Sequence, residues 1–272
     1  MPSAPFPAAA AAETIERSAG PMEQILLASW LIPVLIAPFV GSLLGVVIQR
    51  LPAGRPLVLA RSQCAACGRP LGFFEMLPLI SYLWLGGRCR CGAHAIGRFH
   101  FEIELAALAP PALAALAGQS GATLWFGSLL GWGLITLGWI DATTLLLPDA
   151  LTLPLIPLGL FATWWLAPDA LTAHAAAAAL GYLAMLALAL TWHRWRGIEG
   201  LGARDAKLTA AAGAWSGAAV LPWLMLAAAL LGILLAAVLR LAGREVGRRT
   251  QIPFGPPLAA AIFAAWLLGG SP

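Results

Sequence analysis

Three aspartates at the ends of apolar segments are the side chains best suited to chemistry. Asp141 closes the run ending in GWID, Asp149 follows in LLLPD, and Asp205 opens another run in GARDAK. Ionisable groups at membrane depth are costly and mark candidate functional sites. Two facing carboxylates that share one proton can activate a water, because one acts as base while the protonated partner polarises a carbonyl. If the fold brings Asp141 and Asp205 together, the pair could carry out aspartyl-protease chemistry, which needs no metal.

Each aspartate also has a structural interpretation, since an Asp at a helix end often caps the helix or is an interfacial charge. For Asp149, between Pro148 and the apolar run ALTLPLIPLGL, the N-cap interpretation is preferred. For Asp141 and Asp205 taken alone, a cap or an interfacial role stays open beside catalysis.

The composition determines what kind of chain must position these aspartates. Only 10% of the 272 residues are charged and 60% are hydrophobic, whereas soluble domains have about 25% charged residues. Apolar runs near the roughly 20 residues that cross a bilayer recur along the chain. The apolar residues in these runs are continuous and do not alternate with polar residues, which indicates helices and not a β-barrel. We predict an all-α polytopic membrane protein with about eight transmembrane helices, seven being the alternative.

The predicted organisation has four parts. A polar N-terminal tail (1–24) precedes the first transmembrane helix (25–49), a loop rich in Cys and Arg (50–100) follows, and a transmembrane domain that carries the three aspartates covers 101–272. The apolar segments are expected at 25–48, 103–118, 122–140, 150–167, 171–192, 207–219, 220–240 and 255–269. The sixth is short enough to be a partial or tilted helix.

Arginine orients the predicted helices. All but one of the 16 basic residues are Arg, and seven of them lie in the 50–100 loop. The positive-inside rule places that loop in the cytoplasm. Because successive helices cross the membrane in opposite directions, the connections 141–149, 193–206 and 241–252 are expected on the same side. Asp141 and Asp205 would then share the cytoplasmic boundary. Because no aromatic-interleaved basic stripe is present, nucleic-acid binding is not expected.

Four cysteines in the same loop suggest a structural zinc site. Cys64 and Cys67 form CAAC, and Cys89 and Cys91 form CRC. Thiolate pairs in a cytoplasmic loop favour zinc over disulfides. The second pair is one residue shorter than the usual CxxC, so His94 could replace one sulfur. Reduced or redox-active thiols are the alternative.

From about 38 to 269 the chain resembles the prepilin leader peptidases, GxGD-type membrane aspartyl proteases that are also N-methyltransferases. Five blocks occur in the family's order: VGSLLGVVIQRLP (40–52), the cysteine loop (61–92), IDATTLLLPDALTLPLIPLGL (140–160), GIEGLGARDAKLTAAAGAWSG (197–217) and IPFGPPLAAA (252–261). Three departures stand out: Thr143 where the family often has a second Asp, Arg204 where its motif has Gly, and the CxC pair.

The resemblance implies a function and a set of site residues. Asp141 and Asp205 correspond to the catalytic pair, and the matching blocks imply supporting or substrate-binding roles for Lys207, Gly202, Asp149 and Glu199. The family cleaves the basic leader of type IV prepilins or type II secretion pseudopilins at the cytoplasmic face of the bacterial inner membrane. It then methylates the new N-terminus with S-adenosylmethionine. The alternatives are a catalytically impaired relative that binds prepilins or the assembly machinery, and a proton-coupled transporter.

Overall fold

The computed structural model describes residues 30–57, 68, 72, 75, 77–91, 97–196, 203–243 and 251–269. Within these ranges the chain is helical and forms no β-strand. Six helical segments are long and apolar enough to cross a membrane, and Gly255–Leu268 is a shorter apolar helix. The prediction of an all-α polytopic membrane protein is confirmed.

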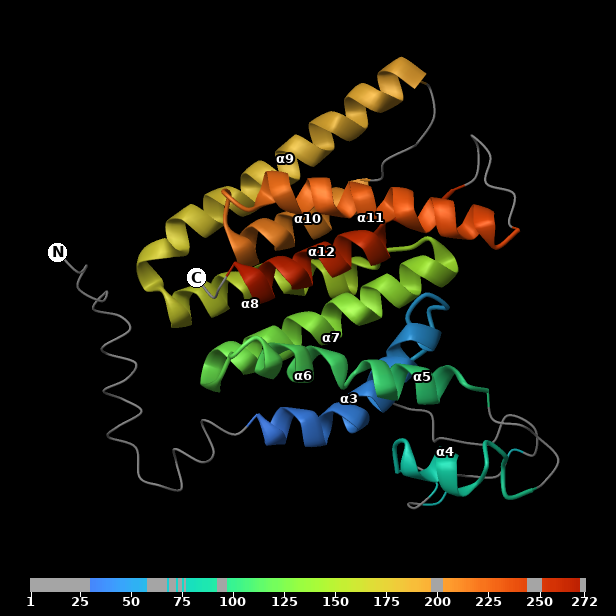
Figure 1. Cartoon of the computed structure of the whole chain (residues 1–272). Helices are drawn as coiled ribbons and strands as arrows, with labels where there is room; N and C mark the ends of the chain where they lie inside the picture. Colours follow the sequence, from blue (N-terminus) through green and yellow to red (C-terminus); the bar gives the residue numbers. More distant parts are fainter. Residues whose placement is uncertain are drawn as a thin grey trace, which may run out of the picture.

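Each of the eight predicted apolar segments corresponds to helix in the structure (Figure 1). The elements are α3 (Leu31–Arg50), α4 (Ile80–Trp84), α5 (Phe99–Ala106), α6 (Ala109–Leu116), α7 (Gly121–Thr144), α8 (Asp149–Leu166), the 3₁₀ helix η2 (Pro168–Ala170), α9 (Leu171–Arg196), α10 (Ala203–Ser216), α11 (Leu221–Leu241) and α12 (Gly255–Leu268). The sixth predicted segment is indeed short: α10 has 14 residues.

The second predicted segment differs from expectation because it is divided into α5 and α6. Pro110 and Pro111 lack the N–H groups that would continue the hydrogen-bond ladder of α5. The carbonyl of Ala107, four residues before Pro111, accepts a hydrogen bond from Trp132 Nε1 of α7 at 2.8 Å instead. The carbonyl that the prolines leave without a helical partner therefore links this segment to α7.

The short helix α10 lies in the centre of the bundle, packed against α8, α9 and α12. Its residues from Leu208 to Trp215 are buried. Gly213 permits a close approach to α9, since a Cβ at this position would lie 2.4 Å from the carbonyl oxygen of Ala177. Trp215 donates to the Leu155 carbonyl of α8 at 2.8 Å and packs edge-on against Trp266 of α12. These contacts hold the second half of α10 against its neighbours, and Asp205 lies in the first turn of the same helix.

The up-and-down course of the helices brings several element ends together. Contacts between side chains and backbone groups join the end of α7 to the starts of α10 and α12, and the start of α8 to α10. On the neighbouring side, Gln49 of α3 lies 3.4 Å from His100 of α5. Asp141, Asp149 and Asp205 all belong to this end of the bundle.

Candidate active site

Asp141 is held by the first amide of another helix. It lies in the last turn of α7 and is only 7% exposed. Its Oδ2 accepts the N–H of Gly255, the first residue of α12, at 2.7 Å. Amides of a first helical turn have no partner within their own helix, and a carboxylate there is favoured by the hydrogen bond and by the helix dipole. Asp141 therefore caps a helix 114 residues further along the chain.

The sequence of α12 explains why one amide needs this partner. Pro256 and Pro257 occupy its first turn and carry no N–H. The N–H of Leu258 already bonds to the Phe254 carbonyl at 3.1 Å. Gly255 therefore supplies the amide that Asp141 satisfies. A Cβ on Gly255 would lie 2.7 Å from Asp141 Oδ2 and 2.8 Å from its Cβ, so only glycine fits beside the carboxylate.

Arg204 connects the first turn of α10 with the end of α7. Helix α7 ends at Thr144, and the residue that caps it, Leu145, has a left-handed conformation (φ 55°) and donates its N–H to the Asp141 carbonyl at 2.9 Å. The carbonyl of Leu145 accepts a hydrogen bond from Arg204 Nη1 at 3.1 Å. Arg204, the residue before Asp205, thus links the start of α10 to the segment that follows Asp141. Asp205 itself is partly buried, and its carbonyl accepts the Thr209 hydroxyl at 2.8 Å.

Asp149 and Lys207 form an ion pair between α8 and α10. Lys207 Nζ lies 2.6 and 2.7 Å from the two carboxylate oxygens of Asp149. The N-cap prediction for Asp149 is wrong, because Pro148 precedes the helix in an extended conformation and Asp149 is the first helical residue. The pair is partly exposed, so its stability contribution is of order 0–1 kcal/mol. Its structural effect is to fix α8 relative to α10.

The other predicted site residues are only partly covered. Glu199, Gly202, Cys64, Cys67 and also His94 lie outside the described residues. Cys89 is buried and Cys91 is exposed, both shortly after α4. Within the described ranges no group of three or more His, Cys, Asp or Glu side chains is placed to hold a metal ion. The zinc site stays a prediction.

Two cavities adjoin the end of α7. The smaller, of about 440 Å³, lies between α3, α5 and α7 and is lined by Ile48, Gln49, Pro52, Ala53, Phe99, Trp139, Thr143 and Thr144. The larger, of about 640 Å³, is apolar and lies between α5, α6, α7 and α12. Trp139 and Thr143 line both cavities. Thr143 bonds back to the carbonyls of its own helix, at 2.9 Å to Trp139.

Glu104 is a buried carboxylate that the sequence interpretation missed. It is 7% exposed on α5, and its Oε2 accepts the N–H of Leu79 at 2.8 Å. The Ser42 side chain of α3 also hydrogen-bonds to it. The sequence did contain a signal for it, because an acidic residue inside a predicted apolar segment is rare in membrane spans.

The fold and the site define an integral membrane protein with carboxylates positioned at one end of a helical bundle. Residues 35–117 match the bacterial peptidase A24 N-terminal domain, and residues 128–237 match the type IV leader peptidase family. A prepilin leader peptidase/N-methyltransferase of Pseudomonas aeruginosa is 38% identical, over 89% of this chain and 91% of the relative. Proteins of the same description from Burkholderia pseudomallei and Aeromonas hydrophila are 42% and 36% identical, over 82% and 87% of this chain and 71% and 90% of those relatives. No solved structure matches the chain.

The chain belongs to the type IV leader peptidase family, and it is a membrane peptidase. This membership confirms the resemblance found in the five sequence blocks and the expectation of an enzyme. It disfavours the transporter alternative, for which the described site offers no separate support.

We predict that Gly255→Ala severely impairs peptidase activity. The new methyl group must displace the Asp141 carboxylate or the start of α12, and a displacement of about 1 Å at a catalytic site can cost about 100-fold in rate. Gly138→Ala is the matched control, because its Cβ would meet its nearest neighbour at an ordinary 3.5 Å. The check is the initial rate of substrate cleavage by both variants at equal amounts of folded protein. Equal rates for Gly255→Ala and wild type would contradict this account of the Asp141 contact.

Proposed function

We propose that the chain removes the leader peptide of type IV prepilins or type II secretion pseudopilins, with Asp141 and Asp205 as its catalytic dyad. The observation that carries the proposal is the clamped Asp141 carboxylate, joined through Leu145 and Arg204 to the turn that bears Asp205. The names of the relatives supply the substrate class.

The proposed reaction needs the two carboxyl groups in different protonation states. The ionised one accepts a proton from water as the oxygen attacks the scissile carbonyl carbon. The protonated one donates a hydrogen bond to the carbonyl oxygen, where negative charge develops. The tetrahedral intermediate then collapses, the C–N bond breaks, and the leaving amine takes up the proton that the first carboxyl group accepted from water. Because Oδ2 of Asp141 already accepts the Gly255 N–H, we assign this role to Oδ1.

We place the site at the cytoplasmic face of the bacterial inner membrane. Arg50 is the last residue of α3, Arg98 precedes α5, Arg196 is the last residue of α9, and Arg204 lies in the first turn of α10 beside the end of α7. Basic residues concentrate on the cytoplasmic side of membrane proteins. A basic leader that stays in the cytoplasm reaches the dyad from this side without crossing the membrane.

Arg204 acts as a positioning residue in this proposal. Its guanidinium donates a hydrogen bond to the Leu145 carbonyl in the α7–α8 connection, and its positive charge also acts on the Asp141 carboxylate of the proposed dyad. An arginine can therefore occupy this position in an active family member. This argument favours the active enzyme over the impaired, binding-only relative.

We predict that Asp141→Asn and Asp205→Asn each lower leader cleavage by about 1000-fold or more, as for other members of a catalytic unit. An amide cannot act as the general base or share the proton. Asp169→Asn, in η2 and away from the proposed dyad, is the matched control and retains wild-type cleavage. The measurement is the gel shift of a co-expressed prepilin.

Two results would refute the dyad. One is normal processing by Asp205→Asn or Asp141→Asn. The other is failure of the wild-type chain to process any prepilin that it binds, which would establish the binding-only role.

We also propose that the smaller cavity binds S-adenosylmethionine for N-methylation of the new terminus. The relatives are named both peptidases and N-methyltransferases, and this cavity lies where the two matched segments meet. Its volume of about 440 Å³ is within the range of ligand pockets, roughly 300–1,000 Å³. Phe99 and Trp139 offer aromatic faces, and Gln49, Thr143 and Thr144 offer hydrogen-bonding groups. When bound, S-adenosylmethionine supplies an electrophilic methyl group.

Filling this cavity is expected to separate the two activities. Ala53 is exposed and lines the cavity, so Ala53→Trp should block binding of radiolabelled S-adenosylmethionine in equilibrium dialysis and leave leader cleavage unchanged. Ala184→Trp, at an exposed position of α9, is the control and should bind normally. Undiminished binding by Ala53→Trp would exclude this cavity as the donor site.

We propose, as a separate point, that Cys64, Cys67, Cys89 and Cys91 hold a structural zinc, with His94 as a substitute ligand. Four thiolates suit tetrahedral zinc, His94 can replace one sulfur of the short CRC pair, and freshly prepared reduced protein is expected to contain about one zinc per chain. Cys64→Ser and Cys67→Ser should each lose it. Elemental analysis provides the check, and metal-free wild-type protein would rule the site out.

A further inference from the structure

The short helix α4 presents an apolar face that no described part of the protein covers. Ile80, Leu83 and Trp84 are 59%, 67% and 70% exposed. Residues at spacings of three and four share one face of a helix. Single exposed apolar residues are ordinary, but a cluster of large ones on one helix face marks a surface that contacts a partner or a membrane.

Contacts with α5 fix the depth of α4 relative to the bundle. Leu79, which precedes α4, donates its N–H to the buried Glu104 carboxylate at 2.8 Å. Tyr82 stacks on Phe101 with ring centroids 4.9 Å apart. Leu79 has a positive φ of 60°, which is unfavourable for leucine, so the bond to Glu104 holds a strained residue in place. Helix α4 therefore lies beside the first two turns of α5 (Figure 1).

The first turns of α5 belong to a membrane-spanning segment of limited length. Phe99–Leu116 comprises 18 residues, which reach about 27 Å at 1.5 Å per residue. The hydrocarbon core is about 30 Å thick, so this segment has no surplus length to extend into water. Leu105, next to Glu104, is 52% exposed and faces outward at the same depth. We therefore expect the start of this segment, with Phe101 in its first turn, to lie close to the boundary of the bilayer.

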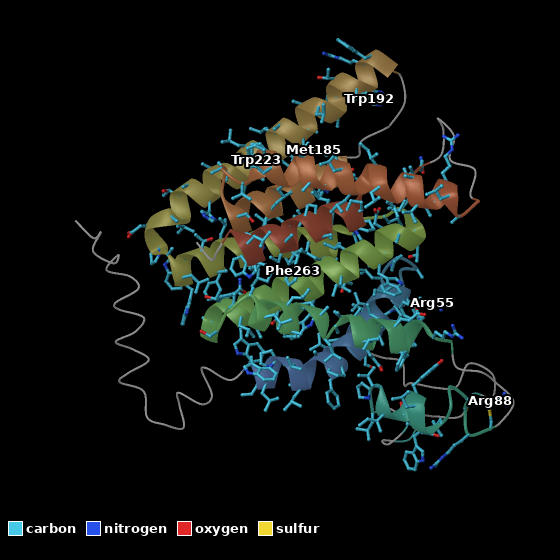
Figure 2. All side chains as sticks on the ribbon, in the orientation of Figure 1. Arg55, Arg88, Met185, Trp192, Trp223 and Phe263 are labelled. Carbon is cyan, nitrogen blue, oxygen red and sulfur yellow. The ribbon has the colours of Figure 1, made fainter. Side chains whose placement is uncertain are left out.

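We propose that α4 is an interfacial membrane anchor, whose Ile80, Leu83 and Trp84 face lies in the boundary between lipid headgroups and acyl chains. A helix with one apolar face and nearby basic residues suits this position, and Trp is enriched there. The exposed Arg88 follows the double-glycine turn after α4, whereas Arg90 lies 3.8 Å from the Glu75 carboxylate. Figure 2 shows Arg88 at the outer side of this loop, where it can meet anionic headgroups. The loop between the first two spans is thus tied to the bilayer surface, independently of the proposed peptidase chemistry.

Depth-dependent fluorescence quenching tests the proposal on the full-length protein. A fluorescent unnatural amino acid replaces Leu83, Trp84 or, as the matched exposed control, Arg90. The protein is placed in vesicles of phosphatidylcholine and phosphatidylglycerol with brominated acyl chains. Quenching by bromine is expected to be several-fold stronger at Leu83 and Trp84 than at Arg90, and quenching by aqueous iodide to show the opposite order.

Other occupants of the α4 face give different results. Iodide quenching at Leu83 as strong as at Arg90 would place the face in water and overturn the proposal. Weak bromine quenching together with self-quenching that grows with protein density would assign the face to a second copy of the chain. Wild-type leader cleavage by the labelled proteins, measured in parallel, shows that they are folded.

The Glu104 contact has its own test in the same assay. Glu104→Gln keeps an oxygen that accepts the Leu79 N–H and should leave the quenching at Leu83 unchanged. Glu104→Ala removes the acceptor, so bromine quenching at Leu83 should fall several-fold. An unchanged signal in Glu104→Ala would show that Glu104 does not set the depth of α4.

Discussion

The hydrogen bond from the Gly255 amide to the Asp141 carboxylate is the contact on which the candidate site depends. It satisfies the one amide that the proline-rich start of α12 leaves without a partner, and it fixes a carboxylate at the end of α7. Burial of an ionisable group in a membrane protein requires such a partner. The two helices therefore cannot shift relative to each other without exposing or orphaning a polar group. This constraint preorganises Asp141 before any substrate binds.

Helix α10 brings the second half of the proposed site to this point. Its small residues allow close packing, as where Gly213 contacts the backbone of α9. Small residues at helix contacts are the usual means of close approach in membranes. Near the start of α10, Arg204 bonds to the end of α7 and Lys207 pairs with the start of α8. The polar contacts of α10 thus set its register, while its apolar surface holds it in the core.

Composition and the length of apolar runs predicted the helical membrane fold and the approximate positions of its helices, because a bilayer restricts both the polarity and the length of a span. The order of the sequence blocks predicted the family. What the sequence could not predict is which groups meet: Gly255 and Asp141 are 114 residues apart. The N-cap prediction for Asp149 failed because local preference favoured a cap, whereas Lys207 of another helix supplied a partner. Glu104 was overlooked because it lies inside an otherwise apolar run.

Two sets of polar contacts at the same end of the bundle hold different parts of the protein in place. Buried polar contacts position the carboxylates, and the Glu104 contact holds the loop that carries α4 beside the span. The pairing of the two aspartates is the central claim. It is tested most directly by the structure of the protein bound to a leader-peptide analogue with a hydroxyl-bearing tetrahedral carbon at the cleavage position. The account predicts that this hydroxyl lies within hydrogen-bonding distance of both Asp141 and Asp205. A hydroxyl bound at Asp149 and Lys207, or far from either member of the pair, would contradict it.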